Sequence, residues 1–146
     1  MSAFLALAQA AVAALVASPA LAGGRVVMGR DRPMPEHHAS QIDVMLDSSR
    51  SRASTLDGTF TRWDTTIGLR LRTRAAAGSD GLTAVDALLA DVFARLAATP
   101  PPAGAARWAL ASDVRWEIDE ADQTLCEAQL LLRIDHFTNG SLAAAV

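Results

Sequence analysis

We consider the histidines first, because their side chains could serve a functional site. His37 and His38 are adjacent, so in an extended segment their rings point to opposite sides and make a poor pair of metal ligands. His136 follows a carboxylate, Asp135, but no third ligand stands at a recognisable spacing. The sequence therefore predicts no metal site.

The other candidate catalytic groups also lack a spacing that suits catalysis. Glu117 with Asp119, and Glu120 with Asp122, have the composition of an acid/base pair, but they surround a predicted turn, where carboxylates are normally hydrated. Cys126, the single cysteine, lies in an alternating apolar segment, which is typical of a small buried side chain rather than of a nucleophile. The sequence has no Gly-x-Ser-x-Gly elbow, no phosphate-binding loop and no Gly-x-Gly-x-x-Gly fingerprint. We expect neither an enzyme nor a cofactor.

Arginines form the clearest charged pattern. Arg70, Arg72 and Arg74 occupy every second position of a predicted strand, so they share one face as a basic row about 13 Å long. Such a row is typical of a solvated or partner-facing edge. The net charge of −3 argues against a dedicated nucleic-acid-binding protein, whose surface normally carries a basic surplus.

Length and composition indicate one globular domain that spans residues 1–146. The length is typical of one domain. Hydrophobic residues make up 51% and charged residues 20%, which excludes a disordered tail or a low-complexity linker.

The N-terminal segment, residues 3–22, contains no charge and has two interpretations. Apolar residues at helical spacing predict a docked helix that ends near Pro19, and its uncharged back face indicates a second packing partner such as a neighbouring subunit. The alternative is a secretory signal peptide, although no arginine precedes Arg25. A membrane span is disfavoured because alanine supplies little hydrophobic drive. The apolar stripe of the predicted helix comprises Phe4, Ala8, Val12 and Leu15.

After residue 24 the pattern changes to an alternation of period two. Short strands are predicted at residues 25–30 and 41–47, a polar loop at 48–58, and a long strand at 63–74.

A second helix begins at Ser79 or Asp80, either of which can cap it, and ends at Thr99. Further strands are predicted from Val114 and across 126–134, joined by an acidic turn. The predicted buried stripe of the second helix comprises Val85, Leu88, Leu89, Val92 and Leu96.

These elements follow the order α-β-β-β-α-β-β. Because the strands come in adjacent runs rather than alternating with helices, we expect an α+β fold. Its sheet is predicted to be antiparallel or mixed, with about five strands, and two helices are predicted to pack on one of its faces.

Several segments together resemble one known family, the tail terminator (tail completion) proteins of long-tailed bacteriophages, to which the lambda minor tail protein U belongs. The similarity follows the order of elements over nearly the whole chain. The segments that carry it are Pro19-Ala20-Leu21-Ala22-Gly23-Gly24-Arg25-Val26, Arg30-x-Arg32-Pro33-Met34-Pro35, Gln41-Ile42-Asp43-Val44, Thr61-Arg62-Trp63-Asp64-Thr65, Asp86-Ala87-Leu88-Leu89, Trp116-Glu117-Ile118-Asp119 and Asp122-Gln123-Thr124.

The resemblance implies a structural subunit of the virion that forms a homohexameric ring on the last ring of the tail tube. Such a ring ends tube polymerisation at the tail-neck junction and offers a joining surface to the head-side connector proteins. The resemblance also implies assembly in the host cytoplasm, and no catalysis, cofactor or membrane.

A closed ring needs a heterologous interface, in which one patch binds a different patch of the neighbour. The basic row and the acidic segment around the predicted turn are candidates for these two patches. A second interpretation is that the row lines the lumen and contacts passing DNA without sequence specificity. The candidate interface residues are Arg30, Arg32, Arg70, Arg72, Arg74, Glu117, Asp119, Glu120 and Asp122.

Three other assignments stay open from the sequence. The chain could be another neck or head-closure protein of the virion. It could be a small secreted or periplasmic binding domain with residues 1–22 as its signal peptide, or a hydrolase that uses His136.

Overall fold

The computed structural model describes residues 1–29, 33–56, 59–76, 78–119 and 124–139. Within them lie two α-helices, a 3₁₀ helix (η1) and five strands, in the predicted order. Their bounds are α1 Ala3–Val16, η1 Leu21–Gly24, β1 Val26–Met28, β2 Ser40–Ser54, β3 Thr61–Arg74, α2 Gly81–Ala98, β4 Ala105–Ile118 and β5 Leu125–Thr138.

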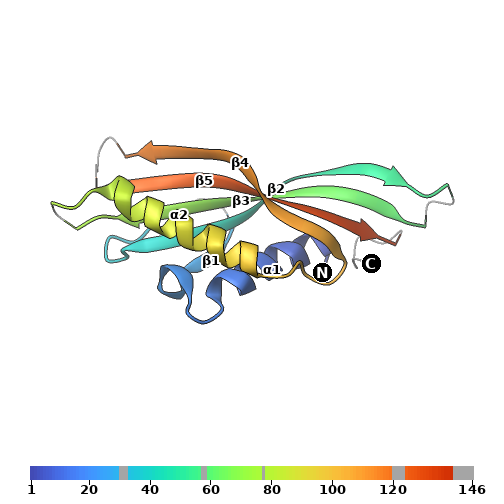
Figure 1. Cartoon of the computed structure of the whole chain (residues 1–146), viewed down its shortest axis with the longest axis horizontal. Helices are drawn as coiled ribbons and strands as arrows, with labels where there is room; N and C mark the ends of the chain where they lie inside the picture. Colours follow the sequence, from blue (N-terminus) through green and yellow to red (C-terminus); the bar gives the residue numbers. More distant parts are fainter. Residues whose placement is uncertain (30–32, 57–58, 77, 120–123, 140–146) are drawn as a thin grey trace.

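The strands form one sheet in the order β1-β2-β3-β5-β4. The strand β1 runs parallel to β2, and the other neighbours are antiparallel, so the sheet is mixed. Both helices lie on one side, which we call the helix face, and the opposite side is the outer face (Figure 1). The predicted α+β fold is therefore confirmed.

Four long strands make the molecule elongated. The strands β2 to β5 have 14 or 15 residues each, which corresponds to about 45 Å of extended chain. The end of β2 and the end of β4 lie at opposite ends of the long axis (Figure 1). Side chains near these two strand ends are therefore far apart on one subunit.

The helix α2 packs as the sequence predicts. Asp80 is its N-cap, accepting from the backbone N–H of Leu82 at 3.0 Å, and Thr99 is its C-cap. All five residues of the predicted stripe are buried against the sheet, where the core includes Ile67, Leu69, Leu130 and Leu132.

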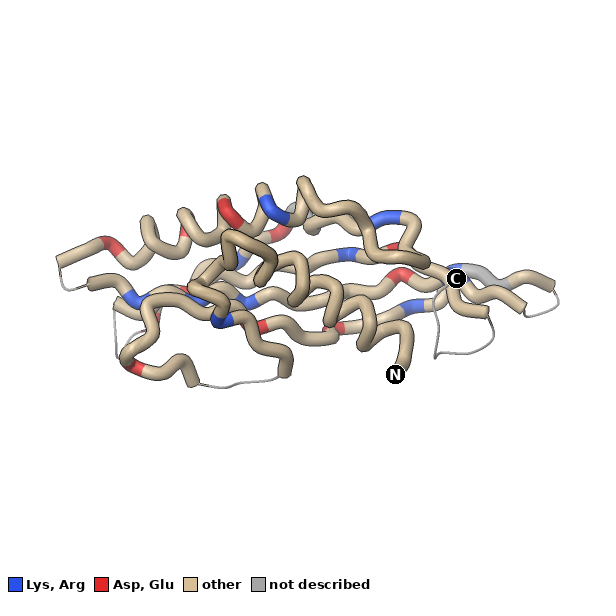
Figure 2. The backbone as a smooth tube through the Cα atoms, turned by 90° about the horizontal axis from the view of Figure 1, so that it is seen from below, with Lys and Arg blue, Asp and Glu red and all other residues tan. Residues whose placement is uncertain are grey.

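The helix α1 also forms and docks, but its buried stripe differs from the predicted one. Ala8 and Leu15 are buried as expected, whereas Phe4 and Val12 are only partly buried. The most buried positions are largely alanines, because a side chain of one methyl group lets the helix backbone approach the sheet closely. The complete buried set is Ala3, Leu7, Ala8, Ala11, Ala14 and Leu15. The tube in Figure 2 shows α1 as a segment without charged residues beneath the sheet.

The largest differences from the predicted strand boundaries are at the end of β2 and the start of β4. Residues 48–54 continue β2 instead of forming a loop, and β4 begins at Ala105 rather than at Val114. The second half of β2 pairs with β3 through polar groups, for example Ser49 with Thr65 at 2.9 Å between the hydroxyl oxygens, so it shows no apolar alternation. In β4 an irregularity between Leu110 and Val114 interrupts the alternation.

Candidate assembly surface

The predicted basic row lies in the middle of the sheet rather than at an edge. Its strand, β3, is flanked by β2 and β5. Arg72 is buried, and Arg70 and Arg74 are half-buried. The expectation of an exposed basic edge is therefore wrong, because the tertiary structure surrounds the strand on both sides.

Two residues of the row face carboxylates on the neighbouring strands. Arg72 Nη2 donates to Asp43 Oδ2 at 2.5 Å, and Arg70 Nε lies 3.5 Å from Glu127 Oε1. The strand register explains both contacts, because it places side chains of β2 and β5 beside the arginine row on the outer face. These arginines thus hold the sheet together, and an additional role in an interface stays a prediction.

The predicted acidic segment is exposed where it is described. Glu117 and Asp119 are exposed at and just beyond the end of β4. Glu117 stands directly opposite Glu127 on β5, and like charges in that position repel each other. Glu120, Asp122, Arg30 and Arg32 lie outside the described residues.

A basic pocket that the sequence did not indicate lies on the outer face, where β3 and β4 begin and β5 ends. It has a volume of about 440 Å³. All four long strands contribute charged side chains to it. Among the described residues these are Arg52 of β2, Arg62 and Asp64 of β3, Arg107 of β4, and Arg133 and Asp135 of β5.

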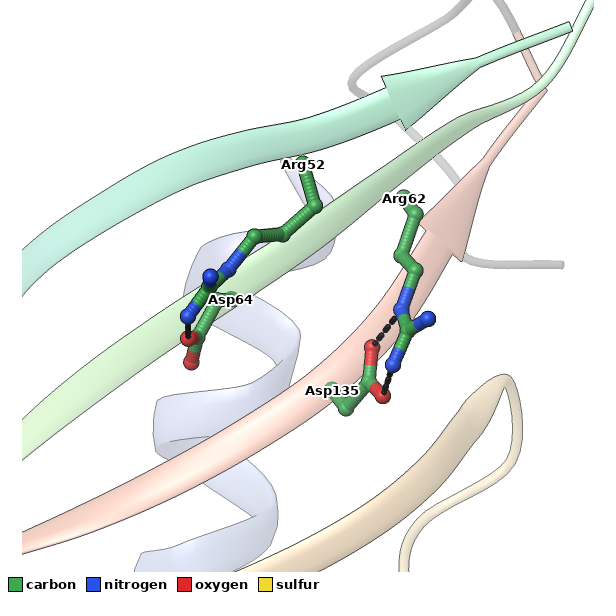
Figure 3. A network of polar contacts seen from close by, with 4 residues as sticks. All are labelled: Arg52, Arg62, Asp64 and Asp135. Carbon is green, nitrogen blue, oxygen red and sulfur yellow. Dashed lines mark hydrogen bonds and ion pairs between the residues drawn. The ribbon is translucent and has the colours of Figure 1, made fainter.

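Two ion pairs join residues that line the basic pocket (Figure 3). Arg52 Nη2 donates to Asp64 Oδ2 at 2.7 Å. Arg62 donates from Nε to Asp135 Oδ1 at 2.9 Å and from Nη2 to the second oxygen. The hydrogen bonds from Arg62 lower the pKa of Asp135, and the same contact raises the pKa of Arg62.

Two further arginines of the pocket keep their charge uncompensated. Arg107 and Arg133 are both exposed, and within the described chain neither forms an ion pair. The pocket therefore has a net positive charge. Sequence reasoning missed it because the register brings Arg107 opposite Asp135, and no local pattern encodes a register.

An apolar groove of about 320 Å³ lies on the helix face at the same part of β4. It runs between α2 and β4 and is lined by Phe93, Leu96, Ala97, Trp108, Ala109, Leu110 and Leu132. Ala109 and Leu110 line both this groove and the basic pocket. The first half of β4 therefore separates a basic surface from an apolar one.

The last residues of β4 expose large apolar side chains. Trp116 retains 50% and Ile118 48% of its surface in contact with solvent. Both point to the helix face, because they pair with the buried residues Ala128 and Cys126 of β5. We call residues 116–119 the acidic tip: it is apolar on the helix side and acidic on the outer side.

The residues considered for chemistry lie apart from one another in the structure. The described residues contain no group of three potential metal ligands. His136 is buried on the helix face, with its ring edge-on to Phe4 and its Nε2 2.8 Å from Thr65 Oγ1, whereas Asp135 points to the outer face. Cys126 is buried as predicted, and burial raises the pKa of its thiol. None of the helices in the described part is long and apolar enough to cross a membrane.

The fold has a counterpart among solved structures. The chain is similar to a chain of the virion of a native gene transfer agent particle, with a TM-score of 0.57 and 17% sequence identity. The similarity covers 94% of this chain and 96% of that chain. At this identity the likeness shows a shared fold. Comparisons with family models and with curated proteins found no match to the sequence.

Proposed function

We propose that this chain is a structural protein of a phage-like virion. The observation that carries the proposal is the end-to-end match of its fold to a chain of a gene transfer agent virion, since both chains are covered almost completely. Virion proteins of this kind act through the surfaces that they present. The proposal therefore places the function in docking and assigns the chain no catalysis and no cofactor.

Within the virion, we propose the role of tail terminator. The sequence resemblance supports this finer assignment, because the segments that carry it extend over nearly the whole chain. A ring on the tail tube needs a subunit with two different complementary patches. The basic pocket and the acidic tip lie toward opposite ends of the long sheet and have opposite charge, which fits that requirement.

The test is deletion of the chain from the particle that carries it, followed by electron microscopy of the lysate. A terminator that caps the tube is needed to stop polymerisation, so we expect tubes of uncontrolled length without attached heads. Restoring the chain should restore tubes of uniform length, and so should a control variant with the exposed substitution Asp91→Ala.

Other outcomes assign other roles. Tubes of normal length without heads would contradict the terminator role and indicate a neck or head-closure protein. Normal particles in the absence of the chain would contradict a structural role in the virion altogether.

A further inference from the structure

We propose that the acidic tip of one subunit docks into the basic pocket of a second copy of this chain. The proposal rests on the proposed function, since it names the contact by which subunits of a ring join. In this contact the basic pocket, rather than the arginine row of β3, supplies the positive charge.

The charge of the pocket fits an acidic protein segment. Arg52 and Arg62 are already paired with the two aspartates of the pocket, so the attraction left for a ligand comes chiefly from Arg107 and Arg133. Two exposed guanidinium groups suit a ligand that carries carboxylates. A binding surface for duplex DNA would need a longer unpaired basic tract, and the chain as a whole is acidic.

Glu117 of the tip faces another carboxylate within its own subunit. Glu117 faces Glu127 directly across the β4–β5 pair, and within the described part Glu117 forms no ion pair. Arg115 precedes it on the same face, also without an ion pair in the described part. Arg70 already lies 3.5 Å from Glu127, so a guanidinium from a neighbouring subunit would act chiefly on Glu117. Asp119 adds a second exposed carboxylate beside it.

The apolar sides of the two surfaces match as well. The tip exposes Trp116 and Ile118 on the side opposite Glu117, and the pocket borders the groove lined by Phe93 and Trp108 on the side opposite Arg107. A tip lying along the start of a neighbouring β4 can thus place its acids on the basic pocket and its tryptophan at the apolar groove. Buried tryptophan and arginine side chains are the residues that most often dominate the energy of an interface.

The strand arrangement leaves this region accessible. In the described sheet β4 is an edge strand that pairs with β5 alone, so its outer backbone groups are open to a partner. Tip and pocket lie toward opposite ends of the strand. Each subunit can therefore receive one neighbour and dock onto another, which is a heterologous contact, the type that forms a ring when the rotation between neighbours closes.

The experiment uses two charge reversals in the full-length chain, Arg107→Glu and Glu117→Arg, and measures the oligomeric mass by native mass spectrometry and sedimentation. We expect the wild type to assemble and each single reversal to weaken association at least about tenfold, since close interfacial charge pairs are strongly coupled. The double reversal Arg107→Glu/Glu117→Arg should restore assembly. The reversal Asp91→Arg, on the exposed surface of α2, is the matched control and should leave the mass unchanged.

Mixing the two single variants guards against a folding defect. In an equimolar mixture, a contact between different variants is either a native pair or a swapped pair, whereas a contact between two copies of one variant joins like charges. We therefore expect assemblies that contain both variants in equal numbers. A Trp116→Ala variant should weaken association in the mixture and alone, because it removes the apolar half of the contact.

Three results would overturn the inference. They are a wild-type chain that does not associate at any concentration, single reversals that leave the mass unchanged, and an Arg107→Glu variant that assembles normally but loses affinity for a short DNA duplex. The microscopy of particles lacking the chain is independent of these measurements, so the terminator role can survive a failure of this contact.

Discussion

The guanidinium of Arg72 donates to the carboxylate of Asp43 across neighbouring strands, with 2.5 Å between Nη2 and Oδ2. Both side chains are buried, with 8% and 2% of their surface exposed. Gln41 Nε2 donates to the other oxygen of Asp43 at 2.7 Å. The centre of the arginine row is thus part of a buried polar network that joins β2 to β3.

This network predicts a non-additive pair of substitutions. Arg72→Met leaves the carboxylate of Asp43 buried without its cation, so we expect a loss of about 3–5 kcal/mol in the free energy of unfolding. The double variant Asp43→Leu/Arg72→Met removes both charges and should recover most of that loss. Urea denaturation measures both values. A loss below about 1 kcal/mol for the single variant would mean that the pair contributes no more than an exposed ion pair.

Arg95 joins the two helices, so we expect its truncation to reduce the stability of the protein. Its Nη1 donates to the carbonyls of Ala14 and Ala17, at 3.0 and 2.6 Å, and its Nη2 to that of Pro19 at 2.6 Å. These carbonyls lie at and just beyond the C-terminus of α1, where a positive charge is favourable. We expect Arg95→Ala to cost about 2–3 kcal/mol in urea denaturation. Amide exchange should become fastest in α1, and the exposed variant Asp91→Ala should show neither effect.

Gly81 is a position in α2 where an added methyl group has no room. A Cβ there would lie 2.6 Å from Cys126 Sγ and 3.3 Å from the carbonyl oxygen of Thr124. Alanine normally stabilises a helix relative to glycine by about 1 kcal/mol, but overpacking outweighs this gain. We expect Gly81→Ala to destabilise the protein by about 1–3 kcal/mol.

The cause of that loss can be isolated with a second variant. In Gly81→Ala/Cys126→Ala the sulfur is gone, so the two substitutions should show a favourable coupling of at least about 1 kcal/mol. Strictly additive effects in thermal or urea denaturation would contradict the steric explanation.

Because His136 is buried, we expect the stability of the protein to depend on pH. Burial lowers its pKa below the ordinary value of 6.5, which its neighbour Asp135 only partly opposes. Below about pH 6.5 the unfolded chain therefore binds more protons than the folded chain. The stability contributed by the neutral, buried imidazole is thus complete above that pH and is lost as the pH falls. Unfolding measured from about pH 8 to pH 5 should show a smaller decrease in the variant His136→Gln than in the wild type. An unchanged slope in His136→Gln would contradict the assignment.

The fold could be predicted to the extent that its elements carry their own periodicity. The stripe of α2 with its Asp80 cap, and the alternation of β3 and β5, are local patterns that the helix and strand geometries require. Residues 48–54 and the first half of β4 lack such alternation, since one segment pairs through polar groups and the other contains an irregularity. Their assignment therefore depends on their partners.

Of the surfaces that we propose for assembly, only the acidic one was among the sequence predictions. Glu117 and Asp119 flank a turn, and their exposure follows from that position in the chain. The basic half was sought in the arginine row, where the spacing is regular, but Arg72 is buried by the neighbouring strands. The residues that form the basic pocket come from four separate strands, and none of them is distinctive in its own segment.

By itself the sequence determined that the chain folds as two helices on a five-stranded sheet and that its residues offer no recognisable catalytic set, because periodicity and motif spacing are local properties. The tertiary structure alone decided which charges remain available to a partner. Strand order and register place Arg72 beside Asp43 in the interior, and they leave Arg107 and Arg133 exposed around a common pocket. Since a charge is neutralised or left free by the residues opposite it on other strands, its role follows from the pairing of the sheet and not from its spacing along the chain.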